Sequence, residues 1–266
     1  MAAAARTRKD AMQHHHLLIS SLLAALCVAS GCASVGPPPV ETGPREGFEA
    51  ASLRSVAVVP FFSADPFGLE PEARAHMLAT YESAAVADLT SLGLEVVAPD
   101  QVREALTAAE RLHELETRLD LDRSIDTLFE TGPFAKREEG VVDDRRVFLQ
   151  ELGALLKVDA VLLGEVVYHT DARCDASSSS TYTPYVVIEG SGRPQGETVP
   201  CAVSHFQAKL IDPREAKPLW FNRALREVRA TAPEASTPDL DQNARRTVEL
   251  VLLETNKGLK GVFARR

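Results

Sequence analysis

The sequence has no excess of positive charge and no long apolar run past its amino-terminal region, and each absence excludes a class of protein. Its 29 lysines and arginines stand against 38 aspartates and glutamates, which gives a formal net charge of −9. An acidic chain repels phosphate backbones and anionic lipid surfaces, so we expect neither nucleic-acid binding nor broad electrostatic docking on membranes. A membrane-spanning helix needs about 20 mostly apolar residues, and we expect none in the mature chain.

Motifs of catalysis and of metal or cofactor binding are also absent from the sequence. It holds no GxSxG turn, no P-loop, no dinucleotide fingerprint and no HExxH pair. Past the amino-terminal region, four histidines are spread over separate expected elements: His76, His113, His169 and His205. His169 and His205 could be neighbours across paired strands. We therefore expect a protein that is not an enzyme and that carries no metal and no cofactor.

The amino-terminal region has the parts of a secretory signal. Three basic residues, Arg6, Arg8 and Lys9, precede the stretch LLISSLLAALCVASGCASVG, which runs from Leu17 to Gly36. The apolar part of this stretch is too short to span a bilayer comfortably, and it ends in small residues, as signal peptides do. We predict a signal peptide over residues 1–31.

The end of this signal resembles the bacterial lipobox, in which small residues directly precede a lipidated cysteine. Residues 29–32 read Ala-Ser-Gly-Cys, with alanine where the pattern prefers leucine. The resemblance implies cleavage after Gly31 and a lipid anchor, including palmitate, on Cys32. Because Ala33 and not aspartate follows the cysteine, the sorting pattern of Gram-negative lipoproteins implies the outer membrane, with the domain facing the periplasm. The alternative is an ordinary signal peptide with an incidental cysteine.

Cysteine is scarce, and its placement is informative. Of the four cysteines, Cys27 leaves with the signal and Cys32 carries lipid, so Cys174 and Cys201 remain. An even pair in an oxidising compartment favours a disulfide bond. Two free thiols, or half of a metal site, are the alternatives.

The rest of the chain divides into a tether and one domain. Residues 32–51 are rich in proline and glycine, which exclude regular structure, and are predicted to be a flexible tether. Residues 52–266 are predicted to form a single domain with two inserted segments, 120–142 and 174–201. The first half of the domain should hold a strand at 55–62, a helix at 70–92 ended by Gly93, a strand at 94–99, and a helix from 101 onward that is capped by Asp100.

The second half of the domain is predicted to be mostly strand. Apolar spacing indicates a helix at 144–156, a strand at 158–169, two strands over 202–212 and 217–228 joined by a turn at 213–216, and a helix at 239–259. On the two turn-linked strands, Phe206, Ala208 and Leu210 should share one face, as should Trp220, Asn222 and Ala224. The order βαβα(α)βββα predicts an α/β fold, in which helices pack on a mixed sheet that ends in an antiparallel meander.

Three stretches together resemble the TolB amino-terminal-domain-like lipoproteins. They are SVAVVPFF followed by a long helix and LGLEVVAPDQVREAL, then LGALLKVDAVLLGEVV, and then AKLIDPREAKPLWFNR. In the last stretch Glu215-Ala216 replaces the usual Thr-Gly turn. The group includes the curli-secretion channel lipoprotein and outer-membrane activators of penicillin-binding proteins. The resemblance implies the fold and a cell-envelope location.

The expected function is therefore that of a binding, assembly or regulatory module of the cell envelope, with an unknown envelope protein as partner. Tyr182 and Tyr185 lie in a Ser/Thr-rich segment and are candidate partner-binding residues, because tyrosine supplies contact area at low entropy cost. A further strand at 185–188 is the alternative for that segment. A secretion-channel subunit is a second hypothesis, although segment 174–201 is short and contains Pro184. A small-ligand sensor is a third hypothesis.

Overall fold

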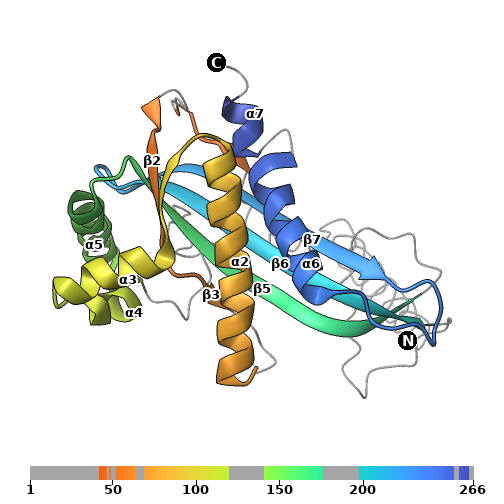
Figure 1. Ribbon diagram of the computed structural model, residues 1–266. Helices are drawn as coiled ribbons and strands as arrows, with labels where there is room; N and C mark the ends of the chain where they lie inside the picture. The colour runs from red at the N-terminus through yellow and green to blue at the C-terminus, as the bar shows by residue number, and fades with distance from the viewer. Residues whose placement is uncertain are drawn as a thin grey trace, which may run out of the picture. The chain divides into compact units, whose positions relative to one another are not determined.

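The computed structural model describes residues 42–46, 48, 52–63, 69–119, 141–175, 198–254 and 258–263. One mixed sheet organises this part of the chain (Figure 1). Its strands are β1 (Gly43–Pro44), β2 (Ser55–Val58), β3 (Phe62–Ser63), β4 (Glu95–Val97), β5 (Ala160–Asp175), β6 (Thr198–Asp212) and β7 (Lys217–Arg229). The helical elements are α2 (Pro71–Ser91), α3 (Pro99–Ala108), α4 (Leu112–Leu119), α5 (Val141–Leu156), α6 (Leu240–Glu249), the π-helical turn η2 (Leu250–Glu254) and α7 (Leu259–Phe263).

The strand order β1-β7-β6-β5-β2-β4 confirms the predicted mixed α/β fold. Strand β2 is parallel to both β4 and β5, whereas β5, β6 and β7 form the predicted antiparallel meander. The short β3 adds to β5 beyond the end of β2.

Side chains alternate between two apolar layers, one on each face of the sheet. Along β2, Val56 and Val58 belong to one layer, and Ala57 belongs to the other. Helices α2 and α6 cover the first face and run side by side, while α3, α4 and α5 contribute to the layer on the second face (Figure 1). The predicted shared faces of β6 and β7 are confirmed, since Phe206, Ala208, Leu210, Trp220 and Ala224 all contact the α2/α6 layer. Within the described part of the chain, no helix is both long and apolar enough to cross a membrane.

Several element boundaries differ from the prediction. The single strand expected at 55–62 is two strands, because Pro60 has no N–H to donate to the sheet ladder. The helix expected from Gln101 to Leu119 is broken after Ala108. There Glu110 adopts a φ of 57°, and the amide of Arg111 donates to the carbonyl of Leu106 over 2.8 Å. These are the features of a Schellman helix end, the same geometry that Gly93, at a φ of 80°, was correctly predicted to provide after α2.

Asp100 was predicted as a helix cap, and this prediction is wrong. Helix α3 begins at Pro99, and its N-cap residue is Ala98. Proline suits the first helical position because the amide it lacks would have no partner there. The side chain of Gln101 accepts a hydrogen bond from the Ala98 amide over 2.9 Å. Asp239, in contrast, caps α6, since its carboxylate accepts from the Gln242 amide over 2.9 Å.

Two segments predicted to be irregular are partly ordered into the sheet. Gly43 and Pro44, inside the predicted tether, form β1 and pair with Phe221 and Trp220 of β7. Proline is tolerated there because β1 is an edge strand. Segment 174–201 is strand at both ends, because β5 extends to Asp175 and β6 begins at Thr198. Segment 120–142 likewise ends inside α5, which begins at Val141; residues 120–140 and 176–197 lie outside the described residues.

Candidate functional site

The predicted disulfide is present at the end of the meander. Cys174 on β5 and Cys201 on β6 are bonded, with their Cα atoms 5.9 Å apart. In the strand register Cys174 lies opposite Val199, so the bond links a diagonal pair across neighbouring strands. Cys201 is fully buried. The bond ties the end of β5 to the start of β6.

The other predicted site residues are not described by the structure. Cys32 precedes the described ranges, and Tyr182 and Tyr185 lie between Asp175 and Thr198. Lipidation at Cys32 and partner binding at the two tyrosines therefore stay predictions.

His169 and His205 are close in the strand register, but they lie on opposite faces of the sheet. His205 pairs with Tyr168, and the two rings stack at 6.0 Å between centroids. His169 instead pairs with Ser204 and contacts Tyr81 of α2, on the other face. Side chains alternate across a strand, so a one-residue offset separates the two imidazoles. The suggested histidine pair is therefore wrong.

The His205 imidazole is held neutral at ordinary pH. Burial lowers its pKa to about 4, and the positive charge of Arg223 adds to the effect. Its Nδ1 atom is buried and makes no hydrogen bond with the described residues. Protonation of a buried imidazole of this kind destabilises the folded protein. The neutral ring therefore suits a packing role beside Tyr168.

A buried polar cluster joins α6 to β6 and β7. The Asn243 side chain of α6 donates to the carbonyl of Ala202 at 3.1 Å, the hydroxyl of Ser204 at 3.0 Å and the carbonyl of Arg226 at 3.2 Å. It also accepts a hydrogen bond from the Arg226 guanidinium. Nearby on α2, burial raises the pKa of the Tyr81 phenol, whose hydroxyl lies 3.4 Å from Nδ1 of His169. These groups fix the α2/α6 pair on the sheet.

Asp159 joins the starts of the two central parallel strands. One of its carboxylate oxygens accepts three hydrogen bonds, from the amides of Arg54 and Ser55 at 3.0 and 3.1 Å and from the Ser55 hydroxyl at 3.1 Å. Desolvation alone would raise the pKa of this carboxyl, but these hydrogen bonds and Arg214 outweigh it and lower the pKa. The carboxylate is therefore ionised over the physiological range.

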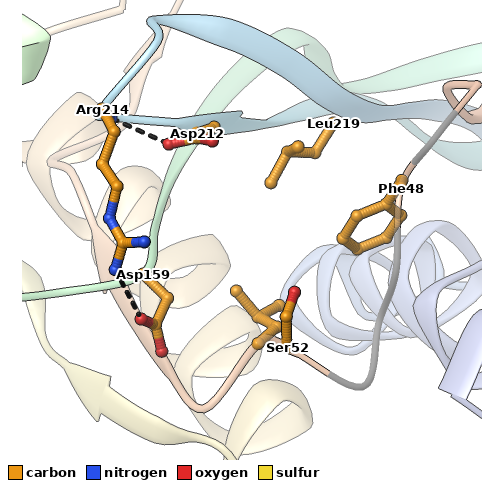
Figure 2. A pocket seen from close by; sticks show the side chains of 7 residues that line it. Phe48, Ser52, Asp159, Asp212, Arg214 and Leu219 are labelled. Carbon is orange, nitrogen blue, oxygen red and sulfur yellow. Dashed lines mark hydrogen bonds and ion pairs between the residues drawn. The ribbon is translucent and has the colours of Figure 1, made fainter.

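Beside Asp159 the structure has a pocket of about 300 Å³ (Figure 2). It lies where the starts of β2 and β5 meet the turn between β6 and β7. Its charged lining residues are Asp159, Asp212 and Arg214, and its apolar lining residues are Phe48, Leu53 and Leu219. Ser52 also lines the pocket. Figure 2 shows the charged residues gathered on one side of the pocket, with Phe48 and Leu219 on the other.

Sequence reasoning did not find this pocket. The turn residues 213–216 and the start of the strand at Asp159 were identified separately, and Phe48 was assigned to the tether. The pocket exists because β1 pairs with β7, and the amide of Arg45 donates to the Leu219 carbonyl over 2.8 Å. The one available signal was Arg214, a charged residue in a turn that differs from the usual pattern. In the ranges that the structure describes, no group of three or more metal-ligating side chains comes together.

Comparison with known proteins gives structural likenesses only. No family model matches the sequence, and no curated protein matches it. Among solved structures, the chain is similar to lipoprotein GNA1162 from Neisseria meningitidis, with 18% identity over 71% of this chain and 90% of that one, at a TM-score of 0.39. It is also similar to the PelC dodecamer from Paraburkholderia phytofirmans (13% identity, 79% and 92% coverage, TM-score 0.36) and to the LpoB C-terminal domain from Salmonella enterica (8% identity, 71% and 86% coverage, TM-score 0.31).

Proposed function

We propose that this protein is a lipoprotein of the bacterial envelope, anchored through Cys32 in the outer membrane, whose periplasmic domain acts by binding another envelope protein. Lipid attachment confines the domain to a thin layer above the membrane. Confinement raises the effective concentration of the domain for partners in the same layer, so modest affinity is sufficient for assembly or regulation.

One observation carries the proposal: a lipobox-like cysteine precedes a domain that has a disulfide bond. Cys32 follows a short apolar signal, and Cys174 is bonded to Cys201 in the folded domain. Disulfides form and persist in oxidising compartments such as the periplasm, and are rare in the cytosol. The export signal in the sequence and the bond in the fold thus point to the same side of the membrane.

Binding is favoured over catalysis by the roles of the buried polar groups. Asn243 joins α6 to the sheet. The Glu82 carboxylate accepts from the Phe61 amide over 2.8 Å and so ties α2 to the chain between β2 and β3. Each of these groups has a structural use that explains its burial. A domain of this kind acts through its surface, and surface loops are the usual place for recognition.

The anchor is tested by substitution and metabolic labelling. We expect Cys32→Ala to abolish palmitate incorporation and to release the protein from membranes into the periplasmic fraction. Cys27→Ala, which changes a cysteine inside the apolar run, is the matched control and should be labelled as the parent protein is. Palmitate labelling that persists in Cys32→Ala would exclude the lipoprotein assignment.

The partner surface is tested separately, in the segment between the two disulfide-bonded strands. Replacing residues 176–183 with a Gly/Ser linker should leave folding and membrane attachment intact and remove crosslinking to the partner. Tyr182→Ala and Tyr185→Ala should each weaken crosslinking, because tyrosine is enriched among the residues that contribute most to binding at interfaces. Recovery of every crosslinked protein at the parent yield would place the docking surface elsewhere on the domain.

A further inference from the structure

The pocket beside Asp159 has two chemically different sides, and together they restrict what it can bind. Phe48, Leu53 and Leu219 provide apolar contact, and Asp159, Asp212 and Arg214 provide charge (Figure 2). Its volume of about 300 Å³ is at the lower end of the range for small-molecule sites, which is about 300–1,000 Å³. A ligand should therefore be small, and it should have an apolar end and a charged end.

Arg214 has donors to offer to a ligand. Its side chain is 78% exposed and forms an ion pair with Asp159 at 3.6 Å, a separation that is longer than a hydrogen bond. Its backbone is hydrogen-bonded, since its amide donates to Asp212 over 2.8 Å and its carbonyl accepts from Gln150. A planar guanidinium in this state is well suited to a carboxylate, which it can bind through two parallel hydrogen bonds.

The two carboxylates beside Arg214 set a second requirement. Three of the hydrogen bonds to Asp159 fall on one oxygen, and its other oxygen faces Arg214. Asp212 uses one oxygen for the Arg214 amide. The charged side of the pocket thus has two negative groups and one positive group. The two aspartates oppose the binding of a simple anion at Arg214, and the arginine weakens the attraction of the aspartates for a simple cation.

A small zwitterion satisfies both requirements, and we propose that this pocket binds a free α-amino acid with an apolar side chain. The ligand carboxylate pairs with the Arg214 guanidinium. The ligand ammonium lies between the carboxylates of Asp159 and Asp212. The apolar side chain packs against Phe48, Leu53 and Leu219. In a free amino acid the two charged groups are attached to one carbon, which matches the crowding of the three charged residues on one side of the pocket.

Binding at this site would also act on the segment that leads to the membrane anchor. Phe48 belongs to that segment, and Arg45 is hydrogen-bonded to β7 next to the pocket. A ligand that contacts Phe48 and Leu219 together bridges Phe48 and β7. This inference develops the small-ligand hypothesis and does not depend on lipid attachment or on a protein partner.

The test is calorimetric titration of the full-length protein, purified in detergent, with L-leucine and L-phenylalanine as probes. At least one of them should bind with a dissociation constant below about 1 mM, a binding free energy of about −4 kcal/mol. Phenylalanine amide lacks the carboxylate, and 3-phenylpropanoate lacks the ammonium. Each should bind about tenfold or more weakly than phenylalanine, as expected for the loss of a charge-assisted hydrogen bond.

Two variants of the pocket test which residue binds the ligand carboxylate and which binds the ligand ammonium. Arg214→Gln should lose the preference for phenylalanine over its amide, and Asp212→Asn should lose the preference over 3-phenylpropanoate while keeping an acceptor oxygen for the Arg214 amide. Arg146→Gln, at an exposed position of α5, is the control and should bind as the parent protein does. The proposal is overturned if neither amino acid binds at about 1 mM, if the amide and 3-phenylpropanoate bind as well as phenylalanine, or if Arg214→Gln leaves both preferences unchanged. Failure of the Cys32 labelling test would leave these titrations unaffected.

Discussion

The Phe61 ring lies so close to the backbone of Gly164 that a methyl group at position 164 would come within 2.5 Å of the ring. Phe61 follows β2, and Gly164 lies in the first half of β5, so the glycine makes room for an aromatic side chain from the neighbouring part of the sheet. Phe61 in turn packs at 5.3 Å between ring centroids against Phe206 of β6. Gly164 is thus required by close packing of the core.

We predict that Gly164→Ala destabilises the protein by about 1–3 kcal/mol, the usual cost of an added methyl group in a packed core. Urea unfolding of the parent and the variant measures the difference. The double variant Gly164→Ala/Phe61→Leu should recover part of the loss, because the smaller side chain leaves space for the methyl group. An unchanged unfolding midpoint in the single variant would contradict the packing argument.

Glycine substitutions at Glu104 and Glu110, inside and just after α3, are expected to change stability in opposite directions. Both are exposed, but Glu104 lies inside α3, whereas Glu110 has a φ of 57° at the helix end. A residue with a Cβ is strained in that conformation by about 1–2 kcal/mol. Glu110→Gly should therefore stabilise the protein by about 0.5–1 kcal/mol, after the extra freedom of glycine in the unfolded chain is subtracted.

Glu104→Gly should have the opposite sign, with a loss of about 1 kcal/mol, because glycine is a poor residue in a helix interior. Thermal unfolding of both variants provides the comparison. If both variants were destabilised equally, the helix end at Glu110 would not have the geometry described.

Asn243→Ala tests the buried cluster that holds α6 on the sheet. The change removes hydrogen bonds to Ala202, Ser204 and Arg226 and leaves their buried groups without this partner. We expect a loss of about 2–3 kcal/mol in unfolding free energy, since each unsatisfied buried group costs about 1–3 kcal/mol. Gln242→Ala, at the neighbouring exposed position, should change stability by less than about 0.5 kcal/mol. Equal effects of the two substitutions would argue against the cluster.

The partly buried carboxyl group of Asp88 should make the stability of the folded protein depend on pH. Its carboxyl on α2 has a buried oxygen that makes no hydrogen bond with the described residues. Burial, and then the negative charge of Glu249 on α6, raise its pKa from 3.8 to about 7. A carboxyl with a raised pKa in the folded state favours folding when protonated, so its contribution is complete below the unfolded value and is lost as the pH rises through the folded value.

We expect Asp88→Asn to remove the loss of stability that the parent protein undergoes as the pH rises. The variant should match the parent near pH 4 and become progressively more stable than the parent as the pH rises from about 4 to about 7. Thermal midpoints measured across that interval give the difference between the two proteins, and contributions from His205 and other groups cancel in it. Asp171→Asn, at an exposed position of β5, should follow the parent throughout. A difference that does not change with pH would contradict the assignment to Asp88.

Removal of the disulfide should destabilise the domain through the unfolded state. Cys174 and Cys201 are 27 positions apart, and a cross-link over a loop of this length is worth about 3–4 kcal/mol on the chain-entropy estimate. We expect Cys174→Ala/Cys201→Ala to lose about that amount in urea unfolding. Added reductant should destabilise the parent and leave the double variant unchanged. Sensitivity of the double variant to reductant would show that another effect is being measured.

Local patterns predicted most of the elements and their faces. The apolar spacing of 70–92 and 239–259 identified α2 and the α6 region, and the alternation along 202–228 identified which side chains of β6 and β7 point to the same face. These predictions succeed because they depend on periods of about 3.6 and 2 residues, which the sequence displays directly. The disulfide followed from counting cysteines once the signal region was set aside.

The histidines and the pocket depended on register and on contacts between distant segments. His169 and His205 differ by one position in the pairing of β5 with β6, where the register shifts between Val166 and Tyr168. No local sequence pattern indicates such a register shift, yet the shift decides which face of the sheet each imidazole occupies.

The sequence by itself determined the α/β class, the faces of the helices and strands, and the pair of cysteines available for a bond. The tertiary structure alone brought Phe48, Asp159 and Arg214 to one pocket and placed Gly164 under Phe61. The physical reason is the distance along the chain over which each effect acts. Periodicity and composition act within a few residues, whereas a cavity forms only where segments more than a hundred residues apart pack with a particular register and leave a gap of a particular shape.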